Sequence, residues 1–365
     1  MTEQRDMPSP SRRPRRSPTM QDVANAAGVT QPTVSRILRG SPVQVAFASE
    51  TRKRVLDAAR QMGYRPNPLP KGLAGADTNL LGVVAREISG PFLAGAMQAI
   101  LAEATGWGCD IAFGHLQGQA SDLVVLRTIL DTRQSDAVIV IGDISDQPLW
   151  LQGLYETNPN VVCVWMGTPT RTDVAMVSVD NRHGVYEVVD HLLELGHTRI
   201  AFVGGHLSMN ATSGDIQERL VAYGDRLANR SIQFRPEYVV RCSSSLAEGA
   251  RAVESLMALP EPPTAIVAAT DVLAIGALYG ARERNLAVPT ELSIAGFDDL
   301  PETAYTSPPL TTVHQPVREV AAAAVHAAIA DGSGIPFATI LTPRLIVRGS
   351  TGPAPAVVNG LGGGR

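Results

Sequence analysis

Hydrophobic residues between positions 19 and 62 recur at spacings of three and four, the period of an amphipathic α-helix. Thr19 with Asp22 three residues later has the form of an N-terminal capping box, so a first short helix should begin near Met20. Gly28 has the backbone freedom that a tight turn needs, and we expect it to end this helix. The apolar face of the predicted helix consists of Val23, Ala24 and Ala27.

A second helix should follow the turn, with Thr30 as its cap and Val29 filling the angle between the two helices. Helical spacing turns one set of its residues inward and another set outward. The inward residues are Val34, Ile37 and Leu38, and the outward residues are Gln31, Pro32, Thr33, Ser35, Arg36 and Arg39. A third helix over residues 49–62, with Val55, Leu56, Ala59 and Met62 at helical spacing, completes a small three-helix core.

The pattern changes at Leu80 into short, continuous apolar runs that alternate with helix-patterned stretches. Such strands are typical of parallel sheets covered on both faces. The runs are too many for one sheet, which predicts two α/β lobes with a cleft between them. The predicted strands are residues 80–85, 136–141, 161–165, 176–180, 199–203, 265–269, 292–296 and 344–348, and predicted helices include 184–195, 247–259, 272–284 and 318–330.

The composition is that of an ordinary globular protein, with 44% hydrophobic and 18% charged residues in a chain of 365. No stretch approaches the roughly 20 apolar residues that a membrane span requires. The N-terminus is rich in Arg, Pro and Ser and lacks the apolar segment of a secretory signal. We therefore expect a cytoplasmic protein with no membrane partner.

Charge is distributed unevenly along the chain, although the net charge is only −4. Residues 1–65 hold 12 basic and 5 acidic residues, a net charge of +7, and the remainder carries −11. A basic end on an acidic body is typical of a phosphate-binding module joined to a domain that does not bind DNA. For the arginines of residues 12–16 alone, a solvated tail without a partner explains the pattern equally well.

The outward face of the second predicted helix presents Gln and Arg beside small hydroxyls, a set that suits the major groove of DNA. Double-stranded DNA is therefore the first partner to test. The pattern alone leaves an alternative open, because small helical hairpins with Ala and Gly are also common in protein cores.

Three short runs closely resemble the headpiece of the lactose-repressor family of bacterial transcription regulators: Asp22-Val23-Ala24, Gly28-Val29 and Thr33-Val34-Ser35-Arg36. Together with the helix geometry, the resemblance implies that Gln31 and Arg36 read bases. Pro32 has no donor and can offer a base only apolar contact. The residues expected on phosphates are Thr30, Thr33, Ser35 and Arg39.

The resemblance extends over nearly all of residues 19–350, through Val179-Asp180-Asn181, residues 191–205, Asp271–Gly276, residues 292–299 and residues 308–315. It implies a small all-α helix-turn-helix headpiece followed by an α/β clamshell of the periplasmic-binding-protein type I, whose two lobes are crossed by three strands. We expect a basic disordered tail over 1–18, the headpiece over 19–65, a hinge over 66–78 and an effector-binding and dimerisation domain over 79–349. Lobe 1 should hold about 79–180 and 316–341, lobe 2 about 181–315 and 342–349, and residues 350–365 should be a flexible tail.

In this family a hinge helix folds on DNA and a leucine wedges into the minor groove at the operator centre, and Leu73 matches that leucine. Asn67 stands where the hinge begins, and we place it among the DNA-binding residues. This chain departs from the family in the hinge, because Pro70 pushes the residue before it out of helical space and Gly72 weakens what remains. We expect a hinge that is less helical than usual or that begins only at Pro70.

The resemblance assigns effector contacts to Arg219 and Asp298, which together offer a small polyol both donors and acceptors. An internal salt bridge or a loop cap is the alternative for each. Thr270 stands where many members have Asn, and Ser244 where several have a stacking aromatic, so a sugar effector is in doubt. Phe92 could supply an apolar wall from the other lobe, or could be an ordinary core residue.

An enzyme is disfavoured, because the seven histidines are scattered and no nucleophile elbow, phosphate-binding loop or metal cluster is present. Cys109, Cys163 and Cys242 lack zinc-site spacing, and we expect buried reduced thiols, no metal and no cofactor. The sequence therefore indicates a homodimeric transcription regulator, most simply a repressor that binds a pseudo-palindrome and is controlled by a small-molecule effector, a sugar or related metabolite, bound between the lobes. A solute-binding receptor and a sugar-phosphate enzyme are the two rival interpretations.

Overall fold

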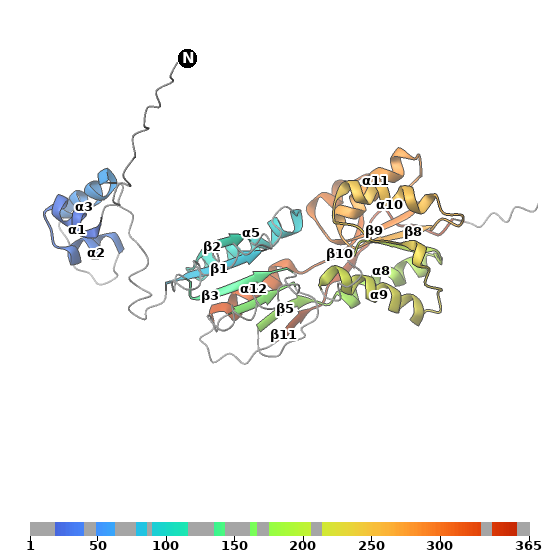
Figure 1. Cartoon of the computed structure of the whole chain (residues 1–365), viewed down its shortest axis with the longest axis horizontal. Coiled ribbons are helices and arrows are strands. Elements are labelled where there is room, and N and C mark those ends of the chain that lie inside the picture. Colours follow the sequence, from blue (N-terminus) through green and yellow to red (C-terminus); the bar gives the residue numbers. More distant parts are fainter. Residues whose placement is uncertain are drawn as a thin grey trace, which may run out of the picture. The chain divides into compact units, whose positions relative to one another are not determined.

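The computed structural model describes residues 19–39, 49–62, 78–85, 90–115, 135–142, 161–165, 175–205, 214–329 and 338–355 (Figure 1). The chain divides into two compact units, Met1–Ala74 and Gly75–Arg365, and each is treated by itself. Within the described residues, no helix is long and apolar enough to cross a membrane.

The first unit contains three helices: α1 (Met20–Ala27), α2 (Gln31–Arg39) and α3 (Ser49–Met62). The predicted capping box is confirmed, since the Thr19 hydroxyl accepts from the backbone N–H of Asp22 and the Asp22 carboxylate accepts from the backbone N–H of Thr19. Gly28 ends α1 in the left-handed region, at φ 62°. The shared core is small, as predicted, and consists of Val23, Ala24, Ala27, Val34, Ile37, Val55, Ala58 and Ala59.

Lobe 1 of the second unit is built on a six-stranded sheet in the order β11-β5-β4-β3-β1-β2, in which every pair is parallel. Two helices, α5 (Pro91–Gly106) and α12 (Val317–Ile329), pack against each other and against this sheet. The strands are β1 (Leu80–Ala85), β2 (Asp110–His115), β3 (Ala137–Ile141), β4 (Val161–Val164), β5 (Ala175–Val179) and β11 (Ala338–Leu341).

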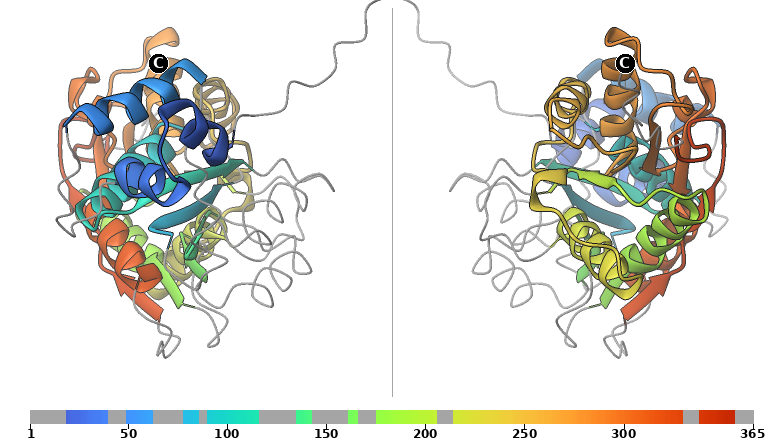
Figure 2. Two further views of the ribbon diagram at one scale, coloured as in Figure 1. Left: turned by 90° about the vertical axis from the view of Figure 1, so that its left-hand side faces the viewer. Right: turned by 90° about the vertical axis from the view of Figure 1, so that its right-hand side faces the viewer.

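Lobe 2 has a second six-stranded sheet, ordered β12-β10-β9-β8-β6-β7, with one antiparallel pair, β10 with β12. Two helices, α8 (Asn181–Glu194) and α9 (Asp215–Asn229), cover one face, and α10 (Leu246–Met257) and α11 (Asp271–Glu283) cover the other (Figures 1 and 2). The strands are β6 (Ile200–Val203), β7 (Val239–Val240), β8 (Ala265–Ala268), β9 (Ser293–Asp298), β10 (Thr311–His314) and β12 (Arg344–Ile346), with short 3-10 turns at Pro236–Tyr238 and Pro301–Tyr305.

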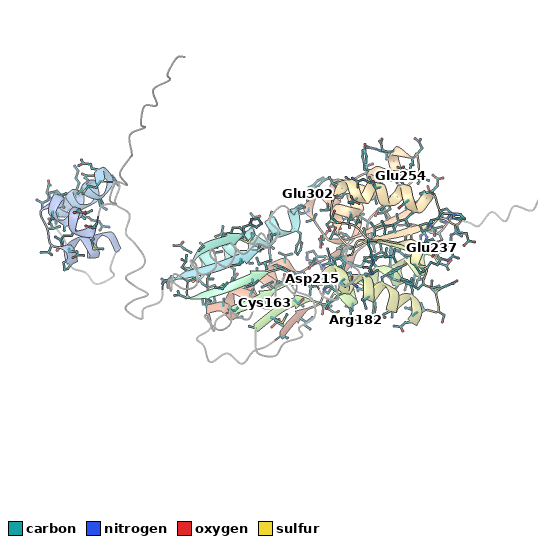
Figure 3. The ribbon with its side chains drawn as sticks, in the orientation of Figure 1. Cys163, Arg182, Asp215, Glu237, Glu254 and Glu302 are labelled. Atoms are coloured by element: carbon teal, nitrogen blue, oxygen red, sulfur yellow. The ribbon has the colours of Figure 1, made fainter. Side chains whose placement is uncertain are left out.

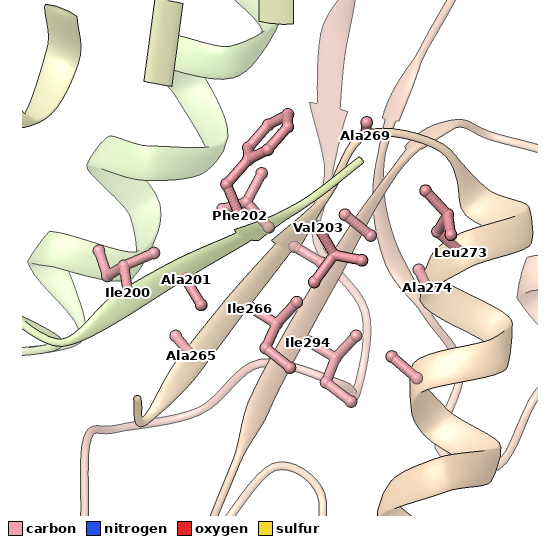
Figure 4. Packing of buried hydrophobic residues seen from close by; sticks show 14 of the residues in the cluster. Ile200, Ala201, Phe202, Val203, Ala265, Ile266, Ala269, Leu273, Ala274 and Ile294 are labelled. Atoms are coloured by element: carbon pink, nitrogen blue, oxygen red, sulfur yellow. The ribbon is translucent and has the colours of Figure 1, made fainter. Parts of the chain in front are cut away.

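The core of lobe 2 is apolar along the whole length of its central strands (Figure 4). Ile200, Ile266 and Ile294 occupy three adjacent strands, and Leu273 and Ala274 of α11 face them. Burial on both faces explains why these strands lack the alternation of apolar and polar residues that half-exposed strands show.

The chain passes between the two sheets three times: from β5 to α8, from β10 to α12 and from β11 to β12. The carboxyl ends of the central strands therefore lie next to the crossings. Open parallel sheets bind ligands at this edge, which makes it the place to examine for an effector site.

The expectation of a flexible end from residue 350 does not hold for Ser350–Ala354. The backbone N–H of Ile294 donates to the Ser350 carbonyl at 2.8 Å, and that of Ala354 donates to the Leu195 carbonyl at 2.8 Å. The Ser350 hydroxyl also accepts from the backbone N–H of Thr311 at 2.8 Å. A composition typical of loops here accompanies a segment that is anchored by hydrogen bonds to lobe 2.

Candidate DNA interface and effector site

The start of α2 is the exposed part of the first unit that the structure describes most fully. Thr30, Gln31 and Pro32 are exposed and Thr33 is half-buried, while Val34 and Ile37 on the opposite side are almost completely buried. The Thr30 and Thr33 hydroxyls lie 2.9 Å apart, and the backbone N–H of Thr33 donates to the Thr30 carbonyl at 3.0 Å. The first turn of α2 contains no acid, so its positive dipole end is free to attract an anion such as phosphate.

The other predicted DNA contacts cannot be compared with this geometry. Ser35, Arg36 and Arg39 are residues of α2, but their side chains lie outside what the structure describes. Asn67 and Leu73, together with the prolines of the hinge, also lie outside the described residues. Their roles at DNA stay predictions.

Arg219 lies in the second turn of α9, which begins at Asp215 (Figure 3). Its side chain is almost fully buried, and its guanidinium lies over the ring of Phe297, 3.7 Å from the ring centre. Nε donates to the Asn181 side-chain oxygen at 2.9 Å, and one terminal nitrogen donates to the Ala269 carbonyl at 2.7 Å. The same nitrogen lies 3.4 Å from the Asp298 carboxylate, so the internal salt bridge foreseen as the alternative is present.

Asp298 ends β9 with φ 129°, a region that favours glycine, and its carboxylate is buried. Gln315, at the start of the second crossing, donates to it at 2.7 Å. Burial raises the pKa of Asp298 to about 6, although Arg219 and Gln315 act in the opposite direction. The backbone of Asp271 at the start of α11 also stabilises the carboxylate, so Asp298 has partners in α9, in α11 and directly after β10.

Asp271, the first residue of α11, is a second buried carboxylate beside Asp298. It accepts from the Thr312 hydroxyl at 2.5 Å and from the backbone N–H of Leu300 at 2.8 Å. Burial and the neighbouring charge of Asp298 raise the pKa of Asp271 to about 7.

Asn181 and Gln315 complete this network, and neither was singled out from the sequence as a site residue. Asn181 begins α8 and donates to Asp215 at 2.8 Å and to Glu218 at 3.0 Å. Asn181 and Gln315 each lie at a crossing between the sheets, and the motifs that carried the resemblance contain both. Their positions after strand ends could have identified them as site residues from the sequence.

Ser244 and Thr270 are brought together near the amino ends of α10 and α11, with their hydroxyls 3.4 Å apart. Thr270 also caps α11 through the backbone N–H of Leu273, at 3.4 Å. Ser244 is exposed and Thr270 is half-buried, so this part of lobe 2 presents hydroxyls.

Phe92 lies in the first turn of α5 in lobe 1, half-buried, and it contacts Trp165. Trp165 directly follows β4 and was not predicted as a site residue. It joins Phe92 at the carboxyl edge of the first sheet, so the structure adds one aromatic residue to the candidate site.

His197, which lies shortly before β6, has a structural role. His197 is buried, with Nδ1 2.9 Å from the Thr264 hydroxyl and Nε2 3.0 Å from the Gly352 carbonyl. Among the described residues, no group of three or more His, Cys, Asp or Glu could hold a metal ion. None of the three cysteines forms a disulfide within the described residues; Cys163 and Cys242 are buried, and Cys109 is only half-buried, contrary to expectation.

Comparisons with known proteins match both units. Residues 19–67 fit the family model described as bacterial regulatory proteins, lacI family, and residues 189–351 fit the periplasmic binding protein-like domain. The HTH-type transcriptional repressor CytR of Escherichia coli (strain K12) is 31% identical over 345 residues, covering 92% of this chain and 97% of that protein. Catabolite control protein A of Priestia megaterium is 30% identical over 308 residues, covering 84% and 90%.

The fold also matches a crystal structure of the lac repressor dimer bound to operator and the anti-inducer ONPF. The TM-score is 0.75 at 24% identity, covering 92% of this chain and 100% of that one. At 24% identity this structural similarity supports the assignment of the fold alone.

Proposed function

Because this chain belongs to the lacI family of bacterial regulatory proteins, we propose that it is a homodimeric repressor whose operator affinity is set by a small molecule. The observation that carries the DNA half is α2, which exposes Thr30, Gln31 and Pro32 and buries Val34 and Ile37 on its other side. A helix held in this way can enter a major groove without losing its own core. The protein then works in the cytoplasm, where its operator is.

The proposed base readers are Gln31 and Arg36, with Thr30, Thr33, Ser35 and Arg39 on phosphates. A bidentate Arg–guanine contact contributes about 1 to 3 kcal/mol of discrimination between bases. Phosphate contacts strengthen binding to all sequences alike. Arg36 should therefore affect selectivity far more than any other single charge of the headpiece.

The experiment begins with selection of bound sequences from a random DNA pool, which identifies the operator directly. In a competition gel shift, Arg36→Ala should bind that operator and unrelated DNA alike, with salt-sensitive background binding retained. Arg60→Ala is the matched control, because it removes one exposed charge from α3, where Arg60 pairs with its neighbour Asp57 at 3.9 Å. Operator selectivity that survives in Arg36→Ala would refute the proposed readout.

The proposed effector site combines Arg219, Asp298, Ser244 and Thr270 of lobe 2 with Phe92 of lobe 1. Its support is the buried network around Asp298, which offers donors and acceptors next to the chain crossings. Binding that changes how the lobes sit on each other would change the spacing of the two headpieces. By linkage, an inducer that weakens DNA binding must itself bind less tightly to the DNA-bound form.

We propose no catalytic activity for this chain. The relatives are named as regulators, and the buried acids of lobe 2 are engaged with Arg219, Gln315 and Thr312. This arrangement favours a binding site that recognises a polar ligand without transforming it.

A further inference from the structure

The chain passes between the two lobes through very short crossings. One residue, Asp180, separates β5 from α8, and two residues, Thr342 and Pro343, separate β11 from β12. Hinges of this kind change the angle between lobes through a few residues at the ends of elements. The contacts that hold these residues therefore set how the two lobes are arranged.

Hydrogen bonds join the first crossing to the third. On the lobe 1 side, the backbone N–H of Asp180 donates to the Leu341 carbonyl at 2.9 Å. On the lobe 2 side, the backbone N–H of Leu345 donates to the carboxylate of Glu187, a residue of α8, at 2.7 Å. Leu341 and Leu345 flank the third crossing, so this crossing is held on both sides by the segment that begins with the first crossing.

The bond from Leu345 to Glu187 uses the outer edge of the lobe 2 sheet. β12 is the last strand of that sheet, and its register with β10 places Leu345 opposite Val313. Successive residues of an antiparallel strand point their N–H groups alternately toward and away from the partner strand, and that of Leu345 points away, to α8. The Leu345 side chain meanwhile packs against the core of lobe 2. A charged acceptor makes this bond stronger than one between neutral groups.

One face of α8 carries a chain of contacts from the first crossing to Glu187. Asp180 caps α8, because its carboxylate accepts from the backbone N–H of His183 at 2.9 Å. The His183 ring lies 3.6 Å from Glu187, four residues along the helix. The two carboxylate oxygens of Glu187 have different neighbours, since Oε1 faces His183 and Oε2 accepts from Leu345. Glu187 thus stands between the start of α8 and the end of the third crossing.

These contacts are separate from the network around Asp298. The first and second crossings lead into that network, because Asn181 accepts from Arg219 and Gln315 donates to Asp298. Glu187 instead contacts an exposed histidine of its own helix and the backbone of β12. A change at Glu187 therefore alters the hinge without removing a residue of the proposed effector site.

From this geometry we propose that Glu187 is a positioning residue: by accepting from Leu345 it fixes the angle at which the third crossing enters lobe 2, and so favours the lobe arrangement that binds operator. The inference rests on the proposed function, because it names what holds that regulator in its DNA-binding arrangement. A dimer reads two half-sites at a fixed spacing. When fewer molecules present that spacing, the apparent dissociation constant for the operator rises by the same factor.

The test compares full-length variants without ligand. Glu187→Ala removes the acceptor, whereas Glu187→Gln keeps a side-chain oxygen that the Leu345 N–H can use. In Glu187→Ala, hydrogen exchange at the Leu345 amide, followed by mass spectrometry, should become about tenfold faster. In a gel shift, its operator affinity should fall about three- to tenfold, with binding to unrelated DNA unchanged. Glu187→Gln should restore most of both properties.

Two controls separate this role from a loss of folded stability. Glu194→Ala removes an exposed carboxylate from the same helix and should behave as the wild type does. Tyr223→Phe removes a buried hydrogen bond to the Ile200 carbonyl, at 2.8 Å, and should lower Tm but leave operator affinity unchanged. Glu187→Leu provides a second variant without an acceptor should Glu187→Ala not fold.

The inference is overturned if Glu187→Ala matches the wild type in exchange at Leu345 or in operator affinity, if Glu187→Gln restores neither, or if Tyr223→Phe loses as much affinity. Operator selectivity of the wild type is measured on the same preparations. A wild type that selects its operator while Glu187→Ala binds equally well overturns only the role of Glu187, whereas a wild type without selectivity overturns the proposed function.

Discussion

Replacing Arg219 with Met removes every hydrogen bond of a buried guanidinium while keeping an unbranched side chain over Phe297. Breaking a buried ion pair by removing one partner typically costs about 3 to 5 kcal/mol, because the other charge is left without compensation. We expect about 3 kcal/mol, the lower end, because Gln315 still donates to Asp298 at 2.7 Å. In a unit of about 290 residues that loss lowers Tm by about 5 °C.

The loss should depend on pH in a direction that the carboxylate fixes. The pKa of Asp298 is raised to about 6 in the folded protein, against about 3.9 in an unfolded chain. The folded state therefore takes up a proton more readily than the unfolded state, and the unfavourable burial of the charge disappears as the pH falls through 6. Without Arg219 this pKa rises further, so Arg219→Met should be most destabilised near about pH 8 and least near about pH 5.

Urea unfolding followed by tryptophan fluorescence measures this, since all three tryptophans lie in residues 75–365. Arg230→Met is the matched control; Arg230 pairs with Asp190 at the surface and should lose less than about 1 kcal/mol. In the double variant with Asp298→Asn, the two changes should fail to add by at least about 1 kcal/mol. A cost for Arg219→Met that equals the control at both pH values, or strict additivity, would refute the reasoning.

Two further stability predictions concern the packing and burial of lobe 2. Burial lowers the pKa of His197, so the folded state binds a proton less readily than the unfolded chain. Below about pH 6.5 the wild type should therefore lose stability relative to His197→Gln. Urea titrations at several pH values measure this difference. Gly249→Ala places a Cβ 2.1 Å from the Leu273 carbonyl oxygen and should cost about 1 to 3 kcal/mol by forcing α10 from α11. Gly95→Ala in α5, with open space around it, should instead be neutral or gain about 0.5 to 1 kcal/mol, and equal Tm values for the two variants would contradict the packing argument.

Local patterns in the sequence were sufficient for the headpiece because its determinants are local. The capping box joins Thr19 and Asp22, and the helix end depends on Gly28 alone. Most central strands of both lobes were also predictable, since burial on both faces leaves them continuously apolar. Four strands were missed: the edge strands β2, β7 and β11, which are only partly buried, and the inner strand β10, whose two threonines and histidine interrupt the apolar pattern.

The candidate site was only partly predictable, because its partners come from distant parts of the chain. Arg219 and Asp298 lie 79 residues apart, and their contacts to Asn181 and Gln315 depend on where the crossings place those residues. Trp165 carries no sequence signal that separates it from a core aromatic. Its left-handed backbone exists only in the folded chain.

The order of the strands has a consequence for synthesis. The lobe 1 sheet receives its edge strand β11 only at residues 338–341, and α12 is added only at 317–329, after most of lobe 2 has been made. The lobe 2 sheet in turn waits for β12 at 344–346. On the ribosome, the headpiece can therefore fold early, whereas both lobes are completed together as the last segments emerge. A nascent chain that stalls before residue 338 would carry a finished DNA reader and an unfinished sensor.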